Sequence, residues 1–164
     1  VLARVADNRD ARRAEVRALA GSTYPLRQLG RSAEARRRLE TAFLRMRELK
    51  LYPAETIEPG SVLVDGLCGR AEMEAGAGNL RQGIEIYQEI IRKLTPMIKP
   101  ESRLEDATDL SGIYLALAQM HRRARQPDLA SAVDVRRLEL WRHWDRKRPN
   151  NPFVQRQLAG VTTQ

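Results

Sequence analysis

The sequence predicts an all-α fold in which three antiparallel helical hairpins form a right-handed stack and a short helix covers its C-terminal end. Residues of high helix propensity, Ala, Leu, Arg and Glu, dominate the chain, and only 5% of residues are aromatic. Apolar residues recur at spacings of three and four, the period of an amphipathic helix, and segments with Gly and Pro separate these stretches. The 164 residues, 42% of them hydrophobic, suffice for one domain with a continuous core.

The first hairpin is predicted over about residues 10–50. Its first helical stripe is irregular and contains Pro25, whose ring should kink the helix or split it. Gly30 supplies a stop, and Ser32 can cap the second helix. That second helix has the clearest apolar face, formed by Ala35, Leu39, Ala42, Phe43, Met46 and Leu49.

The second hairpin is predicted over about residues 61–98. It follows the segment 51–60, whose two prolines and one glycine indicate the longest connection. Its first helix contains Gly66 and Gly69, where we expect another backbone to come close. After an AGAGN turn, the second helix presents to the core Leu80, Ile84, Tyr87, Ile90, Ile91 and Leu94.

The third hairpin is predicted over about residues 106–147, with a turn in the RQPD segment. Asn151 followed by Pro152 is a favourable cap and first helical position. We therefore expect a final short helix over about 152–160 that covers the end of the stack.

The three hairpins share a pattern when they are aligned by their turns. A large apolar residue is followed by a small one four positions later, a turn residue, a small residue that opens the second helix, and a large residue. Small side chains on both helices let the two axes approach. The three copies are Leu19, Thr23, Gly30, Ala35, Leu39 and Ala42; Leu67, Ala71, Gly78, Gly83, Tyr87 and Ile90; and Tyr114, Ala118, Arg125 and Ala130.

This spacing resembles the tetratricopeptide repeat over about residues 16–146, and the stretch GNLRQGIEIYQEII at 78–91 is most similar to it. The family has a period of about 34 residues, whereas the turns here are 48 and 47 residues apart. The resemblance implies an extended version of that right-handed superhelix. It also implies a scaffold that binds a protein or peptide in its concave groove and performs no chemistry.

A second resemblance lies in the C-terminal part, in the stretches DLASAV, LELW and RPNNPFVQRQLA. They are similar to the repeat arrays attached to bacterial serine/threonine protein kinases, which implies a docking or sensory region of such a kinase. Because the chain begins with Val1, we expect it to be a piece of a longer polypeptide. It contains no Gly-rich phosphate loop and no HRD or DFG triplet, so we expect no kinase activity from it.

The charge is strongly basic and unevenly distributed. The net charge is +8, and 25 of the 29 basic residues are arginine. Residues 1–50 carry +7, residues 51–110 carry −5 and residues 111–164 carry +6. Two arginine clusters make nucleic-acid binding an alternative function, although the few aromatic residues and the acidic centre disfavour it. These clusters are Arg36, Arg37 and Arg38, and Arg142, Arg146, Lys147 and Arg148.

No catalytic residue, metal site or cofactor is predicted. His121, His143 and Cys68 fall on three different predicted helices, whereas structural metal sites pair their ligands at short spacing. The single cysteine cannot form an internal disulfide and is expected to be a small core residue. Pairs of neighbouring glutamates have no nucleophile beside them, so solvated helix faces explain them better.

A peptide-binding groove is predicted from the register of the tetratricopeptide resemblance. The inner groove of that family is lined by residues of each first helix that point away from the hairpin core. Here these residues are Arg17, Tyr24, Arg27, Gln28, Glu72, Gln119, Arg122 and Arg123. Long hydrogen-bond donors dominate the set, so we expect an extended acidic peptide or a C-terminal carboxylate as the partner. Ordinary exposed polar residues are the alternative, since every surface helix has a polar face.

Self-association is a second interaction hypothesis. The opposite charges of the ends and the centre could align two chains, and an exposed Trp141 or Trp144 would anchor the contact. The alternative places both tryptophans under the terminal helix. No apolar run approaches a membrane span or resembles a signal peptide, so no membrane insertion is expected. The compartment stays open: cytoplasmic by default, extracytoplasmic if the chain is attached to a membrane-spanning kinase.

Overall fold

The computed structural model describes residues 9–162, and all regular structure within this range is helical. The predicted all-α fold is confirmed. Among these residues, none of the helices combines the length and the apolar character needed to cross a membrane. The elements are α2 (Arg9–Gly21), α3 (Thr23–Gln28), α4 (Ser32–Glu48), α5 (Val62–Gly76), α6 (Leu80–Leu94), the single 3-10 turn η1 (Thr95–Met97), α7 (Leu104–Arg123), α8 (Pro127–Lys147) and α9 (Pro152–Thr162).

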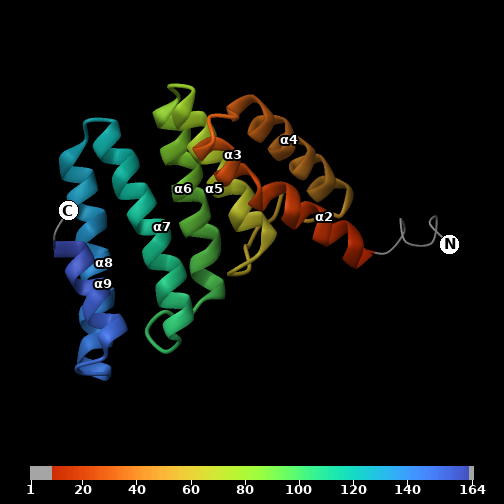
Figure 1. Ribbon diagram of the computed structural model, residues 1–164. Coiled ribbons are helices and arrows are strands. Elements are labelled where there is room, and N and C mark those ends of the chain that lie inside the picture. Colours follow the sequence, from red (N-terminus) through yellow and green to blue (C-terminus); the bar gives the residue numbers. More distant parts are fainter. Residues whose placement is uncertain (1–8, 163–164) are drawn as a thin grey trace.

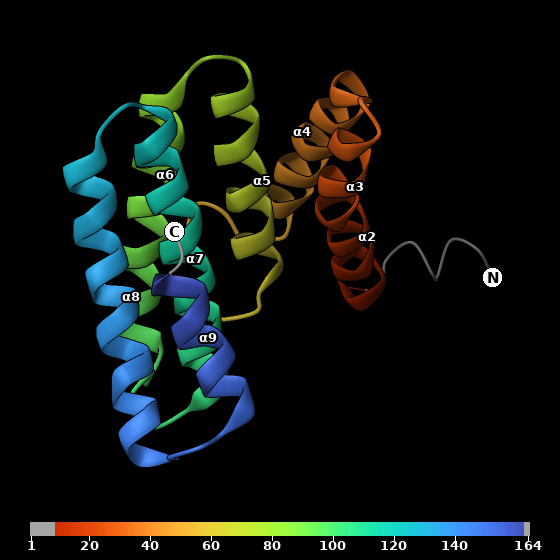
Figure 2. The same ribbon diagram turned by 60° about the vertical axis from the view of Figure 1, so that its left-hand side comes forward.

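The helices pair in chain order and form a row across the molecule (Figure 1). Helices α2 and α3 pack on α4, α5 packs on α6, and α7 packs on α8. Neighbouring hairpins join because α5 also contacts α2 and α4, and because α6 contacts α7. Helix α9 packs against α8 at the C-terminal end (Figure 2). The predicted hairpins and terminal helix follow one another in this order, and the handedness of the stack stays a prediction.

The three turns that were aligned in the sequence share one backbone geometry. Gly30, Gly78 and Arg125 have φ angles of 73°, 92° and 56°, in the left-handed region. The N–H group of the next residue then bonds to a carbonyl group five positions earlier, as in the Schellman ending of a helix. These bonds run from Arg31 to Leu26 (2.8 Å), from Asn79 to Glu74 (2.8 Å) and from Gln126 to His121 (2.9 Å).

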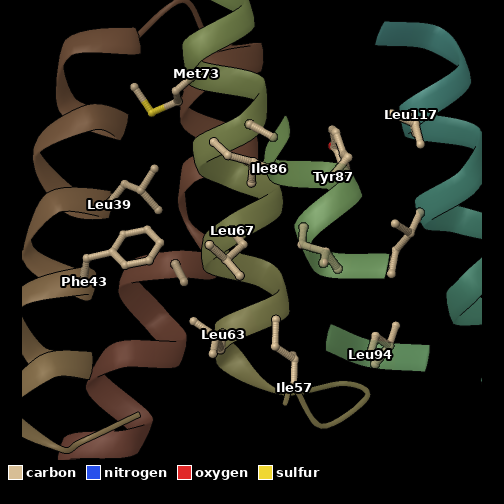
Figure 3. Close-up of a cluster of buried hydrophobic side chains, with 14 of the residues drawn as sticks. Leu39, Phe43, Ile57, Leu63, Leu67, Met73, Ile86, Tyr87, Leu94 and Leu117 are labelled. Atoms are coloured by element: carbon tan, nitrogen blue, oxygen red, sulfur yellow. The ribbon is translucent and has the colours of Figure 1, made fainter. Parts of the chain in front are cut away.

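The main hydrophobic core lies between α4, α5, α6 and α7 (Figure 3). Phe43 of α4, Leu67 of α5 and Tyr87 of α6 are all buried in it. The connection between α4 and α5 also belongs to this core. Ile57 in that connection is 1% exposed, and its N–H group donates to the carbonyl group of Lys93 at 3.1 Å. The longest predicted loop is therefore an ordered part of the packing.

The first helical stripe is split just before Pro25. Helix α2 ends at Gly21 and α3 begins at Thr23, so Pro25 lies in the first turn of α3. A proline is tolerated there because the N–H groups of a first turn have no partner within the helix.

The closest approach of two backbones differs from the predicted one. A Cβ atom at Gly66 would lie 2.9 Å from Cε of Met46, and one at Gly69 would lie 3.0 Å from Oγ1 of Thr23, so both glycines face side chains. At Gly83, however, a Cβ atom would lie 2.9 Å from the backbone oxygen of Ala71. Helices α5 and α6 therefore meet through the small residues of the repeat pattern, at Gly83 rather than at Gly66 and Gly69.

Both tryptophans are buried in a second, smaller core under α9. Trp141 and Trp144 are 0% and 2% exposed, and they pack with Ala107, Val154 and Val161. The indole N–H group of Trp144 donates to the carbonyl group of Pro100 at 2.8 Å. The interpretation of these tryptophans as exposed anchors for self-association is wrong. The alternative, which placed both of them under the terminal helix, is confirmed.

Candidate functional site: a groove between α3, α5 and α7

A groove with a volume of about 550 Å³ opens between the first helices of the three hairpins. We call it the central groove. Its walls come from the α2–α3 junction, α5, α6 and α7. Its lining residues are Ala20, Gly21, Thr23, Tyr24, Arg27, Gln28, Asp65, Cys68, Gly69, Glu72, Tyr87 and Gln119.

Helix α5 forms the floor of the central groove through four residues on one face. Asp65, Cys68, Gly69 and Glu72 are spaced by three, one and three positions, which places them on the same side of an α-helix. Gly69 lets the α2–α3 junction come close, since Oγ1 of Thr23 lies 3.0 Å from the position of a Cβ atom there. The Thr23 hydroxyl group donates to the carbonyl group of Ala20 at 2.7 Å, which fixes this junction.

Glu72 is the centre of the polar contacts in the groove. Its Oε2 atom lies 3.4 Å from Nη2 of Arg27 and 3.4 Å from Nη1 of Arg123. Its Oε1 atom accepts a hydrogen bond of 3.2 Å from the hydroxyl group of Tyr87. One carboxylate therefore joins α3, α5, α6 and α7 and brings two guanidinium groups together at the edge of the groove.

Cys68 on the floor and Tyr87 on α6 stay protonated. Burial, with smaller contributions from Asp65 and Glu72, raises the pKa of the Cys68 thiol to about 12. The pKa of Tyr87 is also raised, by burial first and then by the negative charges around it. Tyr87 therefore acts as a hydrogen-bond donor to Glu72, and Cys68 is not a reactive thiolate.

The opposite end of the central groove is acidic. Burial raises the pKa of Asp65, and the positive charge of Arg17 partly offsets this effect. Burial also raises the pKa of Asp109 on α7, with further contributions from Glu105, Asp106 and Asp65. The groove thus carries both signs of charge, since Asp65 adds a second acidic residue to the predicted Glu72.

The structure gathers most of the predicted peptide-binding residues around the groove. Five of the eight line it: Tyr24, Arg27, Gln28, Glu72 and Gln119. Arg123 forms an ion pair with the groove residue Glu72. The positive charge of Arg17 lowers the pKa of Asp65, another groove residue, and so partly offsets the effect of burial.

Arg122 does not lie in the central groove. Its guanidinium group binds the carboxylate of Asp134 on α8. It lines a separate cavity of about 400 Å³, together with residues of α8 and Val161 of α9. The one-residue step from Arg123 to Arg122 turns the side chain by about 100° around α7, which carries it from the groove to the α8 side.

Sequence reasoning missed Asp65, Cys68, Gly69 and Tyr87. The first three could have been found, because together with Glu72 they follow the helical period on α5. Tyr87 could not have been found in this way, since the residue is 3% exposed and belongs to the core, and its hydroxyl group is what reaches Glu72.

The arginine clusters proposed for nucleic acid are partly engaged within the chain. Arg36, Arg37 and Arg38 are exposed on α4, and Arg38 is paired with Glu34 at 2.8 Å. In the C-terminal cluster, the Lys147 ammonium group and the Arg148 guanidinium group lie 4.9 Å and 5.9 Å from the centre of the Trp144 ring. Neither cluster lies on the central groove.

Metal-binding geometry is not found in the described part of the chain, where no three His, Cys, Asp or Glu side chains gather at a suitable distance. His121, His143 and Cys68 lie on α7, α8 and α5. His121 is buried, and its Nδ1 atom lies 2.8 Å from Oε1 of Gln126.

The fold and the groove together define an all-α protein whose stacked hairpins enclose a polar groove with both positively and negatively charged side chains. No family model matches the chain, and no curated protein or solved structure shows significant similarity to it. The tetratricopeptide and kinase-repeat resemblances therefore stay predictions.

Replacing Asp109 with asparagine is expected to stabilise the fold at neutral pH. The pKa of Asp109 is higher in the folded chain than in the unfolded chain, so its ionisation opposes folding. This cost is absent well below the unfolded-state pKa of about 3.9 and is complete above the folded-state pKa. For a partly exposed group we expect a rise in Tm of about 1–2 °C at pH 7 that disappears as the pH falls to about 3.

Thermal melts of both chains between pH 3 and pH 8 measure this effect. Glu139→Gln, at an exposed carboxylate on α8, is the control and should change Tm little at any pH. A lower Tm for Asp109→Asn at pH 7 would contradict the expected sign.

Proposed function

We propose that this chain is a non-catalytic module that binds an extended peptide segment in the central groove and holds one carboxylate of that segment at Arg27 and Arg123. The observation that carries the proposal is the meeting of these two guanidinium groups, from α3 and α7, at the edge of a cavity of about 550 Å³. Guanidinium groups suit carboxylates because their donors match both oxygen atoms.

The other walls of the groove also favour an extended chain. Tyr24 is 66% exposed, and Gln28 and Gln119 are exposed amides without a hydrogen-bond partner among the described residues. Amide side chains can both donate to and accept from a peptide backbone. Asp65 at the other end of the groove, with Asp109 near it outside the lining, disfavours a second carboxylate there, so a peptide with its acidic group near one end fits best.

The proposal is tested by selecting binders from a library of short random peptides. Peptides enriched by the wild-type chain should carry an acidic side chain or depend on a free C-terminal carboxylate. The double variant Arg27→Ala/Arg123→Ala should bind them about tenfold to a hundredfold more weakly, because hydrogen bonds to charged groups contribute about 1.5–3 kcal/mol. Fluorescence anisotropy with a labelled, enriched peptide measures the Kd.

Arg81→Ala is the matched control, because the Arg81 side chain is 93% exposed on α6 and, among the described residues, its only ion-pair partner is Glu85. Its Kd should equal that of the wild-type chain. Equal binding by the double variant, or an enriched pool without any preference for carboxylates, would remove the proposed site.

Association with a bacterial serine/threonine kinase belongs to the same proposal as its wider context. The exposed polar groove and the absence of kinase motifs in the sequence favour a docking role over a catalytic one. Capture experiments with the soluble domains of such kinases, using the double variant as control, would test this context.

A further inference from the structure

Glu72 already satisfies the arginine pair in the free chain. Arg27 and Arg123 are far apart in sequence, yet both lie 3.4 Å from the same oxygen, Oε2 of Glu72. We infer that Glu72 holds the two guanidinium groups that a ligand carboxylate binds, so that it competes with the ligand for them; this inference rests on the proposed function. Glu72 would then set both the affinity and the selectivity of the central groove.

The contacts of Glu72 are of the kind that an incoming carboxylate can replace. Charge-assisted N–H···O bonds are usually about 2.7–2.9 Å long, and both bonds here are longer. The side chains of Arg27, Arg123 and Glu72 are 26%, 44% and 29% exposed, so water and ligands reach them. Since Arg27 and Glu72 both line the cavity, a ligand carboxylate can approach Arg27 from the groove, and Arg123 lies next to it at the same oxygen of Glu72.

Glu72 keeps one hydrogen-bond donor, Tyr87, when the two arginines bind a ligand instead. Its other oxygen, Oε1, accepts the hydrogen bond from Tyr87, and that phenol stays protonated because its pKa is raised. The carboxylate can therefore remain in place without its arginine partners. Its negative charge then repels the ligand carboxylate, which lowers the affinity for acidic peptides.

The size of the effect follows from how often Glu72 holds the arginines. If the arginine pair is free for only about one tenth of the time, the apparent Kd is raised about tenfold. Replacing Glu72 with glutamine removes the competing charge and keeps an oxygen atom that can accept the Tyr87 hydrogen bond. The variant Glu72→Gln should therefore bind acidic peptides about tenfold more tightly than the wild-type chain.

The experiment compares Glu72→Gln with Glu74→Gln. Glu74 lies two residues further along α5, outside the central groove, and accepts a hydrogen bond from Asn79 at 2.9 Å. The first probe is a peptide enriched by the wild-type chain, used with its acidic side chains intact or replaced by amides, and with a free or amidated C-terminus. Only forms that keep the bound carboxylate should gain affinity in Glu72→Gln, and Glu74→Gln should not differ from the wild-type chain.

A second probe needs no peptide. Acetate is titrated against both variants while the side-chain NMR signals of Arg27 and Arg123 are followed. In Glu72→Gln, acetate should shift both sets of signals at lower concentration than in the wild-type chain. A thermal melt confirms that the variant is folded.

The outcomes separate this inference from the proposed function. Unchanged or weaker peptide binding by Glu72→Gln overturns the inference, while a loss of binding in Arg27→Ala/Arg123→Ala still supports the proposed site. Acetate binding at the arginines of Glu72→Gln, together with no peptide binding by any chain, supports the carboxylate position and removes the peptide function.

Discussion

Trp141→Ala is expected to lower the free energy of unfolding by about 3–5 kcal/mol, the usual range for a buried aromatic residue. Trp141 of α8 is fully buried against α7 and α9, and its ring meets that of Phe153 edge-on at 5.8 Å. Its N–H group donates to the Ser111 hydroxyl group at 2.8 Å. The truncation leaves a cavity in the smaller core and removes one of the side chains on which α9 packs.

Urea denaturation followed by circular dichroism measures this loss, because the helical signal does not depend on the removed indole. Trp141→Phe is the matched control. It keeps a buried aromatic ring but loses part of the indole volume and the donor to Ser111, so we expect a smaller loss of about 1–2 kcal/mol. Val135→Ala, at a half-exposed position on α8, should change stability by less than about 0.5 kcal/mol. A loss below about 1 kcal/mol in Trp141→Ala would contradict the packing of α9 on α8.

Gly83→Ala is expected to destabilise the fold by about 1–3 kcal/mol, although alanine is the better helix former. The new Cβ atom would lie 2.9 Å from the backbone oxygen of Ala71 and 3.5 Å from Cβ of Ala75. A backbone oxygen cannot turn away as a side chain can. Helices α5 and α6 must then move apart, and the core between them loosens.

The same substitution in α7 provides the control. Gly112 is an exposed helical glycine with no atom of another segment near its would-be Cβ position, so Gly112→Ala should stabilise the chain by up to about 1 kcal/mol. Chemical denaturation of both variants gives opposite signs if the helix contact is as described. A stabilisation by Gly83→Ala equal to that of Gly112→Ala would rule out the close contact.

The sequence predicted the environment of Gly83, but it left two alternatives open for the tryptophans. Gly83 was expected to be a small residue at a helix contact because it recurs in the repeat pattern, and the structure places it against Ala71. The tryptophans had two readings in the sequence, as exposed anchors or as part of a covered end. An apolar residue on a helix predicts burial, but it does not say which later segment buries it.

The central groove was likewise predicted from the sequence only in part. The register of the tetratricopeptide resemblance predicted that residues including Tyr24, Arg27, Gln28, Glu72 and Gln119 would line one groove, and these five lie around the central groove. It did not predict that Glu72 would lie between two arginines. That arrangement depends on the distances between α3, α5 and α7, which no local pattern contains.

The sequence by itself determined the helical class, the order of the hairpins and the turns at Gly30, Gly78 and Arg125, because helix propensity, apolar period and turn chemistry are local properties. Only the tertiary structure decided that Arg122 turns to Asp134, that Trp141 is covered by α9 and that one carboxylate joins Arg27 to Arg123. These contacts depend on how neighbouring helices pack, and a shift of one residue around a helix is enough to move a side chain from one groove to another.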